Sequence, residues 1–586
     1  MGEVPETAPN SLGEETSELI RKIALLNAYR HGGKAESGPV LGRLLGEKPD
    51  LKPMTQSLIS VIRTIIDEVN SIPEKRQGEI LQEKWPETLI EPVRVEEKRL
   101  TPLLNVERWG RVVTRFSPNP DCVLHLGSAR AIILCHDYAK MYKGRFLLRF
   151  EDTDPRLKKP VLEFYDAIRE DLLWLDCKWD EEYIQSDRIP IYYEFAEKLL
   201  KDGNAYVCTC RPEEFKRSAV LSSPCPCRNQ PPQVHLDRWQ RMKDGTFKEG
   251  EAVLRVKTDL KHPNPAVRDW PALRIVEANH PRVGRKFRVW PLYNMACGVD
   301  DHLMGITHII RGKEHLTNET RQRYLYSHLG WTYPEAIHYG RLKIRGALLS
   351  KSKILKGLRE GVYSHWDDPR LATFAALRRR GINPESIRRM IIEVGVKPVD
   401  ATLSWENLYS INRKILDPTA DRYFFVANEV PLSVKGLAKD YELRLPLHPD
   451  RRGREDRALT VRIYDGVGRV WVSRNDLRTL LEHSIVRLMG FINIKIDSAM
   501  EDRAEASYHS EGLTEARRMK APLVQWVPFE DFLPTHVVMQ DSSIVKGLSE
   551  TSCRRLKVGQ VIQFERFGFV RVDSINSSLK TYYSHG

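Results

Sequence analysis

A turn at residues 117–128 carries the first side chains whose types and spacing could do chemistry. It reads SPNPDCVLHLGS and lies between a strand-like run, RVVTRF, and a helical run that begins at residue 129. A turn before a helix presents backbone N–H groups and the positive helix end to a phosphate. Gly127 would let a flat base approach the backbone, and His125 could donate a hydrogen bond to phosphate oxygens. A proline-rich loop whose histidine only caps the helix has the same pattern, so this segment alone leaves both interpretations open.

A second segment, GALLSKSK at residues 346–353, follows a strand-like run and combines glycine, serine and lysine. A lysine on a mobile loop can neutralise the charge that builds up on a phosphoryl group in a transition state, and stabilisation at that point accelerates a reaction. Lys351 is the candidate for this role. A solvated surface loop has the same composition, so the second segment is also ambiguous when it is taken alone.

Together, in this order and about 225 residues apart, the two segments resemble the paired signatures of the class I aminoacyl-tRNA synthetases. The first is similar to the family's His-Ile-Gly-His element, with Ser128 in place of the last histidine. The second is similar to its Lys-Met-Ser-Lys-Ser element, with Leu348 in place of the first lysine. The resemblance implies that His125 and Lys351 are catalytic. The ATP-binding residues that it implies are Pro118, Asn119, Pro120, His125, Gly127, Ser128, Ser350, Lys351 and Ser352.

The blocks around these signatures resemble the glutamyl and glutaminyl branch of the family. They are RFSPNPDCVLHLGSAR, RFLLRFEDTDP and WPLYNMACGVDDHLMGITHIIRGKEH. The resemblance implies that Arg115, Glu151 and Tyr293 bind the amino acid, whose carboxylate needs a cation and whose ammonium group needs an anion. A surface ion pair is the alternative interpretation of Arg115 and Glu151.

Arg311 decides which amino acid the resemblance favours. The glutamate enzymes of the branch carry arginine at this position, and many glutaminyl enzymes carry a smaller uncharged residue. A guanidinium group can bind a side-chain carboxylate through two hydrogen bonds, whereas a neutral amide would leave a buried cation incompletely paired. We therefore expect L-glutamate as the substrate. A structural arginine between helix and sheet is the alternative for Arg311.

Four of the nine cysteines form two close pairs, Cys208-x-Cys210 and Cys225-x-Cys227. Four thiolates at this spacing can surround one tetrahedral Zn²⁺, and a fully ligated ion leaves no position for a reacting water. The spacing therefore predicts a structural zinc site. A metal-free loop with buried thiols is the alternative, and a redox pair is disfavoured because the segment has no CxxC motif.

A parallel nucleotide-binding sheet must position these residues, because strand, turn, helix and strand patterns follow one another between residues 111 and 150. We expect a multidomain protein whose α/β catalytic domain is of the Rossmann type. Alternating apolar residues around a D-G turn, as in LTVRIYDGVGRVWVS, predict C-terminal β-barrels. The expected boundaries are 1–100 for an N-terminal helical domain, 106–200 and 291–355 for the two halves of the catalytic domain, 201–290 for an inserted domain with the zinc site, 356–415 for a helical connecting domain and 416–586 for the β-barrel anticodon-binding region.

The ends of the chain resemble the archaeal type of this branch. NAYRHGGKAESGPVLGRLLGE is similar to its helical appendix, and FERFGFVRVDS is similar to its β-barrel anticodon domains. In this setting the inserted domain would bind the acceptor end of tRNA, and the β-region would hold anticodon bases on aromatic or arginine faces. The candidates for anticodon contacts are Tyr423, Phe424, Trp471 and Arg451 to Arg454, and the candidates for contacts with the corner of the tRNA are Arg378 to Arg380.

The composition agrees with a nucleic acid as partner. The 586 residues carry 92 Lys and Arg against 79 Asp and Glu, a formal net charge of +13, and phosphates favour clustered cations. No stretch reaches the ~20 apolar residues that a membrane-spanning helix needs. The N-terminal segment lacks the basic and apolar parts of a secretory signal. We therefore expect a protein that acts in the cytoplasm and contacts no membrane.

The resemblance implies ATP and Mg²⁺ as cofactors, L-glutamate as substrate and tRNA(Glu) as acceptor, with tRNA(Gln) as a second acceptor in a non-discriminating enzyme. It also implies a monomer and, in the non-discriminating case, a functional link to a tRNA-dependent amidotransferase. Arg311 opposes a glutaminyl enzyme, and intact His125 and Lys351 oppose a tRNA-binding paralogue without catalysis. A zinc-dependent nucleic-acid hydrolase is disfavoured because the predicted zinc has no open position.

Overall fold

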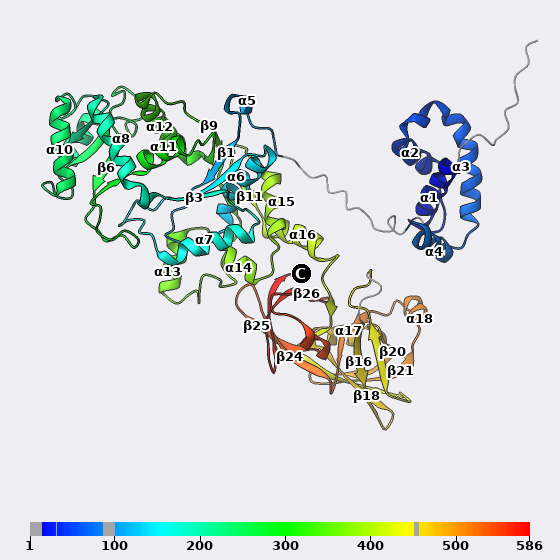
Figure 1. The fold of residues 1–586 in the computed structure, drawn as a ribbon. Helices are drawn as coiled ribbons and strands as arrows, with labels where there is room; N and C mark the ends of the chain where they lie inside the picture. The colour runs from blue at the N-terminus through cyan, green and yellow to red at the C-terminus, as the bar shows by residue number, and fades with distance from the viewer. Residues whose placement is uncertain (1–13, 31, 86–99, 451–455) are drawn as a thin grey trace, which may run out of the picture. The chain divides into compact units, whose positions relative to one another are not determined.

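The computed structural model describes residues 14–30, 32–85, 100–450 and 456–586. The chain divides into two compact units, Met1–Glu97 and Lys98–Gly586. Figure 1 shows a helical first unit, in blue, and a longer second unit whose carboxy-terminal part consists mainly of strands. In the described part of the chain, no helix is long and apolar enough to cross a membrane. The predicted order of a helical start, an α/β centre and a β-rich end is confirmed.

The first unit is a bundle of helices. Its described helices are α1 (Glu14–Arg30), α2 (Ser37–Glu47), α3 (Thr55–Asn70) and α4 (Glu74–Lys84), with a 3-10 turn at Pro49–Met54. α3 buries Leu58, Ile62 and Ile66, because residues four apart share one face of a helix. The amide of Gln77 on α4 is buried and donates to three backbone carbonyls at 2.9 to 3.0 Å, which ties the helix ends together.

Parallel strands position the candidate site in the second unit. The first sheet has the order β1-β2-β3, with β1 (Val113–Phe116), β2 (Arg145–Phe150) and β3 (Glu181–Ile184) all parallel and with α6 (Ala129–Met141) and α7 (Leu162–Trp174) as crossover helices. A second parallel pair, β8 (His308–Gly312) and β9 (Glu335–Tyr339), begins beside β1, where the N–H of Thr307 donates to the carbonyl of Val113 at 3.0 Å. The predicted βαβ unit is confirmed, and its carboxyl edge is where α/β proteins bind ligands.

An antiparallel sheet interrupts the parallel strands. Its order is β4-β5-β6-β7, with β4 (Ala205–Cys208), β5 (Val253–Val256), β6 (Pro271–Ile275) and β7 (Val289–Pro291), and it is accompanied by α8 (Ile189–Lys201), α9 (Pro212–Val220) and α10 (Pro232–Asp244). Trp239, Trp270 and Trp290 are buried in its core. α11 (Tyr293–Leu303) then returns the chain to the parallel strands, and α12 (Leu316–Leu329) connects β8 to β9.

Short elements connect the parallel strands to the carboxy-terminal sheets. They are β10 (Leu342–Ile344), α13 (Lys351–Arg359), α14 (Phe374–Arg379), α15 (Pro384–Val394), β11 (Ala401–Leu403) and α16 (Trp405–Leu416). β10 and β11 pair in parallel, and β11 is a strand that the sequence pattern does not predict. Three residues are too few to show the alternation that identifies a strand.

Lys351 and its neighbours form the first turn of α13, so the prediction that they lie in a loop is wrong. Ser350 precedes the helix in an extended conformation, with φ of −89° and ψ of 109°. Ile354 is buried on the inner face against Leu371 and Ala376. This packing stabilises the helix. The preceding sequence, which contains Gly and Ser, does not predict a helix here.

The basic residues at the end of α14 make contacts within the chain. Arg380 is buried, and its guanidinium group donates to Tyr409 and Ser584. Arg378 and Arg379 pair with aspartates of the same chain. The prediction that Arg378 to Arg380 contact the corner of a tRNA is therefore wrong for Arg380, which instead joins the connecting helices to the last strand.

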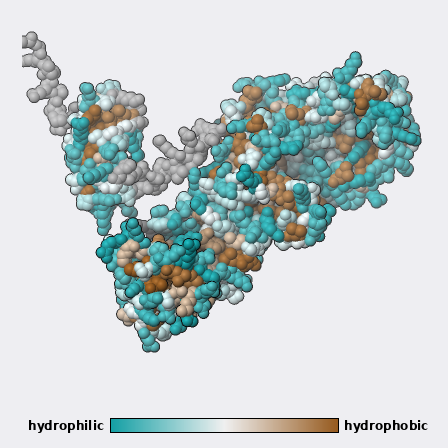
Figure 2. All heavy atoms as spheres, turned by 180° about the vertical axis from the view of Figure 1, so that it is seen from behind, coloured by the Kyte–Doolittle hydropathy of each residue, from teal (hydrophilic) through white to brown (hydrophobic). Residues whose placement is uncertain are grey.

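Two large sheets and one two-stranded sheet form the carboxy-terminal part. The first has the order β12 (Arg422–Tyr423), β26 (Val561–Phe564), β27 (Gly568–Ile575), β28 (Leu579–His585), β24 (Phe532–Val538), β25 (Ile544–Glu550) and β13 (Phe425–Ala427). The second has the order β17 (Ile463–Tyr464), β18 (Val467–Ser473), β14 (Glu429–Lys435), β21 (Ala504–Ser510), β20 (Asn493–Ala499), β19 (Ile485–Leu488) and β22 (Leu523–Val524), and β23 (Trp526–Pro528) pairs with β18. β15 (Tyr441–Leu445) pairs with β16 (Arg457–Val461), and the helices here are α17 (Leu477–Glu482) and α18 (Leu513–Arg518). On the face shown in Figure 2, hydrophilic residues surround scattered apolar patches.

Asp171 on α7 is a buried carboxyl group. Its side chain accepts the N–H of Leu124 and lies 3.7 Å from Arg378, yet burial raises its pKa from 3.8 to about 7. Because the pKa in the folded chain lies above that in the unfolded chain, ionisation of Asp171 destabilises the fold. The contribution of Asp171 to the free energy of unfolding is therefore largest below about pH 4, and it is lost as the pH rises to about 7.

We expect Asp171→Asn to raise the melting temperature at pH 8, because the variant has no charge to bury. The gain in unfolding free energy should be at most about 4 kcal/mol and should shrink toward pH 5. Calorimetry at the two pH values measures it. Asp166→Asn, at an exposed position of the same helix, is the control for removing a carboxylate from α7 and should not raise the melting temperature at pH 8. A variant that melts at or below the parent temperature at pH 8 would contradict this assignment.

Candidate active site

A cavity of about 560 Å³ opens where β1 and β2 end. Its lining residues are Ser117, Asn119, Glu151, Lys158, Pro271, Leu292, Tyr293, Asn294, His315, Asn318 and Arg321. The side-chain oxygens of Ser117, Asn119 and Asn294 are buried and have no hydrogen-bond partner within the described residues. Buried polar atoms normally have a partner, so three unpaired oxygens in one cavity wall indicate that the cavity binds a polar ligand.

Four charged side chains of alternating sign lie next to this cavity. They are Arg115, Asp301, Arg149 and Glu151, and we call them the buried charge chain. Asp301 accepts from Nε of Arg115 at 3.0 Å and from Nη1 of Arg149 at 2.7 Å. Nη2 of Arg149 donates to Oε1 of Glu151 at 3.0 Å. Burial raises the pKa of Glu151, and Arg149 and Arg115 offset only part of that rise. Burial would also raise the pKa of Asp301, but the two guanidinium groups outweigh it and hold that pKa well below its usual range.

The motifs predict roles for Arg115 and Glu151, but they do not identify Arg149 as part of the site. A signal was present, because an arginine inside the apolar strand RFLLRF needs a buried partner. That partner, Asp301, is 152 residues away along the chain, so only the fold identifies it.

Arg311 on β8 is a buried cation without a counter-ion. Its side chain is 5% exposed, Nη1 donates to Gln322 at 3.1 Å and Nη2 donates to the hydroxyl of Tyr333 at 3.0 Å. Nε has no hydrogen-bond partner, and no carboxylate among the described residues lies within ion-pair distance of the guanidinium group. A buried charge without an opposite charge is costly, so the site is suited to an anion.

Tyr293 and His315 line the cavity with their rings 5.4 Å apart. Burial and the positive charges of Arg311 and Arg115 lower the pKa of His315 to about 4, so its ring is neutral at pH 7. The pKa of Tyr293 is raised well above its usual value, mainly by burial. The two rings therefore add hydrogen-bonding groups but no charge. Lys158 and Arg321 are the cations in the cavity wall, and Arg311 is a buried cation that interacts electrostatically with Tyr293.

His125 precedes a short 3-10 turn that leads into α6. Its Nδ1 accepts the N–H of Gly127 at 3.1 Å, and burial lowers its pKa, so the ring is neutral and carries its proton on Nε2. A Cβ at Gly127 would lie 2.8 Å from this ring, so only glycine allows the contact. The carbonyl of Pro118 accepts the N–H of Glu151 at 2.9 Å, which ties the turn to the end of β2.

The two segments with catalytic signatures meet in the fold. The ammonium group of Lys351 forms an ion pair with Asp121, which lies in the turn between β1 and α6. The hydroxyl groups of Ser350 and Ser352 lie 3.2 Å apart at the start of α13. The predicted pairing of a phosphate-binding turn with a basic segment therefore has a geometric basis.

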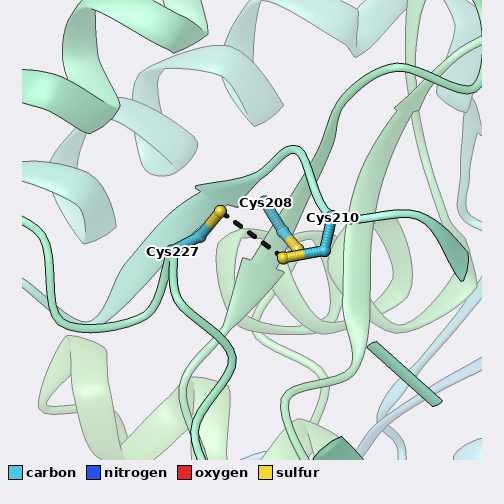
Figure 3. A group of neighbouring side chains, drawn as sticks. All are labelled: Cys208, Cys210 and Cys227. Atoms are coloured by element: carbon cyan, nitrogen blue, oxygen red, sulfur yellow. Dashed lines mark hydrogen bonds between the residues drawn. The ribbon is translucent and has the colours of Figure 1, made fainter. Parts of the chain in front are cut away.

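The predicted cysteine ligands gather in the inserted sheet (Figure 3). The sulfur atoms of Cys208, Cys210 and Cys227 all lie within 4.8 Å of one another, and those of Cys210 and Cys227 are 3.7 Å apart. Cys225 lies outside this group of three. Its sulfur is 3.9 Å from that of Cys208 and 3.5 Å from the hydroxyl of Tyr206.

Two of the predicted anticodon contacts fall on core residues. Tyr423 and Phe424 are buried between the carboxy-terminal sheets, so the prediction is wrong for them. Trp471 is part-buried, stacks on Phe529 with the ring centroids 4.6 Å apart and donates its indole N–H to the Phe529 carbonyl. Arg451 to Arg454 lie outside the described residues.

Comparison with known protein families identifies the family to which this chain belongs. Residues 111–418 match the catalytic domain of the family described as tRNA synthetases class I (E and Q). The chain belongs to this family. Residues 420–510 and 523–573 of the synthetase match the anticodon-binding domains of the same family. The family assignment made from the paired signatures is confirmed.

Relatives of the synthetase match it from end to end. It is 49% identical over 577 residues to the glutamate–tRNA ligase of Pyrococcus furiosus, with 97% of this chain and 100% of the relative covered. It is 50% identical over 566 residues to the glutamate–tRNA ligase of Thermococcus kodakarensis, with 96% and 98% covered. Class I synthetases use ATP and Mg²⁺ and load an amino acid onto tRNA, and both matched anticodon-binding domains agree with tRNA as a substrate of this synthetase.

Proposed function

We propose that this synthetase is a glutamate–tRNA ligase, which activates L-glutamate with ATP and transfers it to the 3′ end of tRNA(Glu). Arg311 carries the proposal, because it is buried among neutral partners and lacks a counter-ion within the described chain. The side-chain carboxylate of glutamate would supply the missing anion, whereas the amide of glutamine would not. The near full-length similarity to glutamate–tRNA ligases supports the same conclusion.

Glu151 and Tyr293 in the cavity wall, and the buried Arg115 beside it, suit the remaining charges of glutamate. Glu151 accepts from Arg149 through Oε1, so Oε2 is left to accept from the ammonium group of the substrate. Arg115 uses Nε and Nη2 for Asp301, so Nη1 is left to donate to a carboxylate. The hydroxyl of Tyr293 would share the side-chain carboxylate with Arg311.

The proposed reaction has two steps. The α-carboxylate of glutamate attacks the α-phosphorus of ATP, and pyrophosphate leaves. The terminal ribose hydroxyl of tRNA then attacks the carbonyl of the glutamyl-adenylate, and AMP leaves. When Mg²⁺ is bound with ATP, it neutralises charge on the phosphates.

His125 and Lys351 would stabilise phosphate charge in the first step. Nε2 of His125 carries the ring proton and can donate it to a phosphate oxygen in a hydrogen bond. Lys351 would exchange the carboxylate of Asp121 for the phosphates, which carry more negative charge. The remaining residues proposed to contact ATP are Pro118, Asn119, Pro120, Gly127, Ser128, Ser350 and Ser352.

Exchange of labelled pyrophosphate into ATP, with tRNA(Glu) present, tests the choice of amino acid. We expect exchange with glutamate and little exchange with glutamine at equal concentrations. Preferential exchange with glutamine would show that Arg311 does not select a carboxylate and would favour a glutaminyl enzyme. Binding of tRNA without any exchange would favour a paralogue without catalysis.

Action as a monomer in the cytoplasm is part of the proposal, because charged tRNA is used there by the ribosome. If tRNA(Gln) is charged with glutamate as well, the product needs a tRNA-dependent amidotransferase to convert the glutamyl group. That partner would then be part of the physiological function.

We also propose a structural Zn²⁺ held by Cys208, Cys210, Cys225 and Cys227. The three gathered sulfur atoms and the approach of Cys225 to Cys208 support it. Four thiolates complete a tetrahedron, so the ion would stabilise the inserted sheet and take no part in the reaction.

We expect the purified protein to contain about one equivalent of zinc by mass spectrometry of the metal content, because four thiolates bind zinc tightly. Cys227→Ser should lose the zinc and melt at a lower temperature, since a thiolate ligand is removed. Cys553→Ser changes a buried cysteine of the carboxy-terminal part and should keep the zinc. A zinc-free parent protein, or equal zinc in both variants, would contradict the proposal.

A further inference from the structure

Asp301 and Arg149 have no role in the chemistry described above, although they are almost completely buried beside the cavity, at 1% and 0% exposure. We propose that they are positioning residues, which fix the orientation and charge of Arg115 and Glu151 and thereby set the affinity for the amino acid. This inference rests on the proposed function, because it assigns Arg115 and Glu151 to the charged groups of glutamate.

Asp301 fixes the plane of the Arg115 guanidinium group. It accepts from two of its nitrogens, Nε at 3.0 Å and Nη2 at 3.3 Å. A guanidinium held through two nitrogens cannot rotate freely, so the direction of the third nitrogen is also determined. The side chain of Arg115 is buried, and water is therefore a poor substitute for the carboxylate.

Arg149 keeps Glu151 in place while leaving one of its oxygens free. The two terminal nitrogens of Arg149 bind different carboxylates, Nη1 that of Asp301 and Nη2 that of Glu151. Nη2 also lies 3.3 Å from the sulfur of Cys297, which closes the space around it. A single arginine thus sets the distance between the two carboxylates.

The five buried charged side chains have a net charge opposite in sign to that of glutamate, and Lys158 and Arg321 add two further positive charges at the cavity wall. The buried charge chain has two cations and two anions, and Arg311 adds one positive charge, so these five side chains sum to +1. Glutamate, with two carboxylates and one ammonium group, carries −1. Without the carboxylate of Asp301, the same groups sum to +2, and Arg149 would compete with the substrate's ammonium group for Glu151.

Asp300 provides a matched control. It is the neighbouring residue on α11, is 0% exposed and is also held by an arginine, with Nε of Arg188 at 2.8 Å. Its other partners are Gln185 and Tyr192, and none of these three residues lines the cavity. Removing the charge of Asp300 therefore perturbs a buried ion pair of the same helix. Asp300 also interacts electrostatically with Arg149 but forms none of the hydrogen bonds that hold Arg115 and Glu151.

The experiment compares Asp301→Asn, Asp300→Asn and the parent full-length enzyme in tRNA-dependent pyrophosphate exchange, with melting temperatures measured for all three. We expect Asp301→Asn to raise the KM for glutamate by about 10- to 100-fold, because misplaced binding groups have effects of this size. The KM for ATP should stay within about twofold in the same variant. Asp300→Asn should lower the melting temperature but leave the KM for glutamate within about twofold.

Arg149→Lys is the second variant, which keeps a positive charge but presents one nitrogen in place of two. We expect the same selective rise in the KM for glutamate, and this variant decides the question if Asp301→Asn does not fold. The inference would be overturned, and the proposed function left standing, by an unchanged KM for glutamate in a folded Asp301 or Arg149 variant. An equal rise of this KM in Asp300→Asn would have the same meaning. No exchange with glutamate by the parent enzyme would overturn both the inference and the proposed function.

Discussion

Replacing Arg311 by cysteine is expected to lower kcat/KM for glutamate by about 100- to 1,000-fold, which corresponds to losing one partner of a buried, hydrogen-bonded charge pair. The guanidinium group would be the counter-ion of the side-chain carboxylate, and its neutral partners Gln322 and Tyr333 cannot replace it. Glutamine should lose less, because its amide makes no ion pair with Arg311. The ratio of glutamate to glutamine turnover should therefore shift toward glutamine, as measured by pyrophosphate exchange with each amino acid.

Arg323→Cys is the control for the Arg311 variant. Arg323 lies on α12, contacts the Tyr333 ring and pairs with Glu319 at the surface, so the same substitution removes an arginine next to the site without removing a buried cation. Its ratio of glutamate to glutamine turnover should equal that of the parent. An unchanged ratio in Arg311→Cys would remove Arg311 from the choice of substrate.

Replacing Lys351 by alanine is expected to lower kcat for pyrophosphate exchange by about 100- to 1,000-fold, the usual effect of removing one group that stabilises transition-state charge. The KM for glutamate should change little, because Lys351 lies against Asp121 in the phosphate-binding turn and does not line the cavity. Rapid single-turnover measurements of adenylate formation separate this step from the transfer to tRNA.

Lys353→Ala is the matched control for Lys351→Ala. Lys353 lies in the same first turn of α13 but is exposed, and its substitution removes an equal charge from the segment. Its kcat should stay close to that of the parent. A similar loss in both variants would mean that the segment acts through its overall charge, and a fully active Lys351→Ala would exclude the role assigned to it.

The elements that hold the site could be predicted because their signals are local. The helix pattern from residue 129 and the apolar run at 145–150 correspond to α6 and β2, whose periods depend on near neighbours in the chain. The helix at Lys351 could not be predicted in this way. It depends on packing of Ile354 against Leu371, and tertiary contacts of this kind override the loop preference of the preceding glycine and serine.

The chemistry of the site depends more on long-range contacts. The position of Arg311 could be matched to a family, but its lack of a counter-ion follows only from the fold. The link between Arg149 and Asp301 is equally invisible in the sequence. Tyr423 and Phe424 were predicted to contact the anticodon but are core residues. The sequence cannot separate the two cases, because exposed and buried aromatic residues on strands occur in the same pattern.

The most direct test is charging of purified tRNA(Glu) and tRNA(Gln), each with labelled glutamate and, in parallel, with labelled glutamine, in the presence of ATP and Mg²⁺. We predict labelled glutamate on tRNA(Glu). Glutamate on tRNA(Gln) as well would identify the non-discriminating type, which works with an amidotransferase. Glutamine on either tRNA, or no glutamate on tRNA(Glu), would contradict the proposed function.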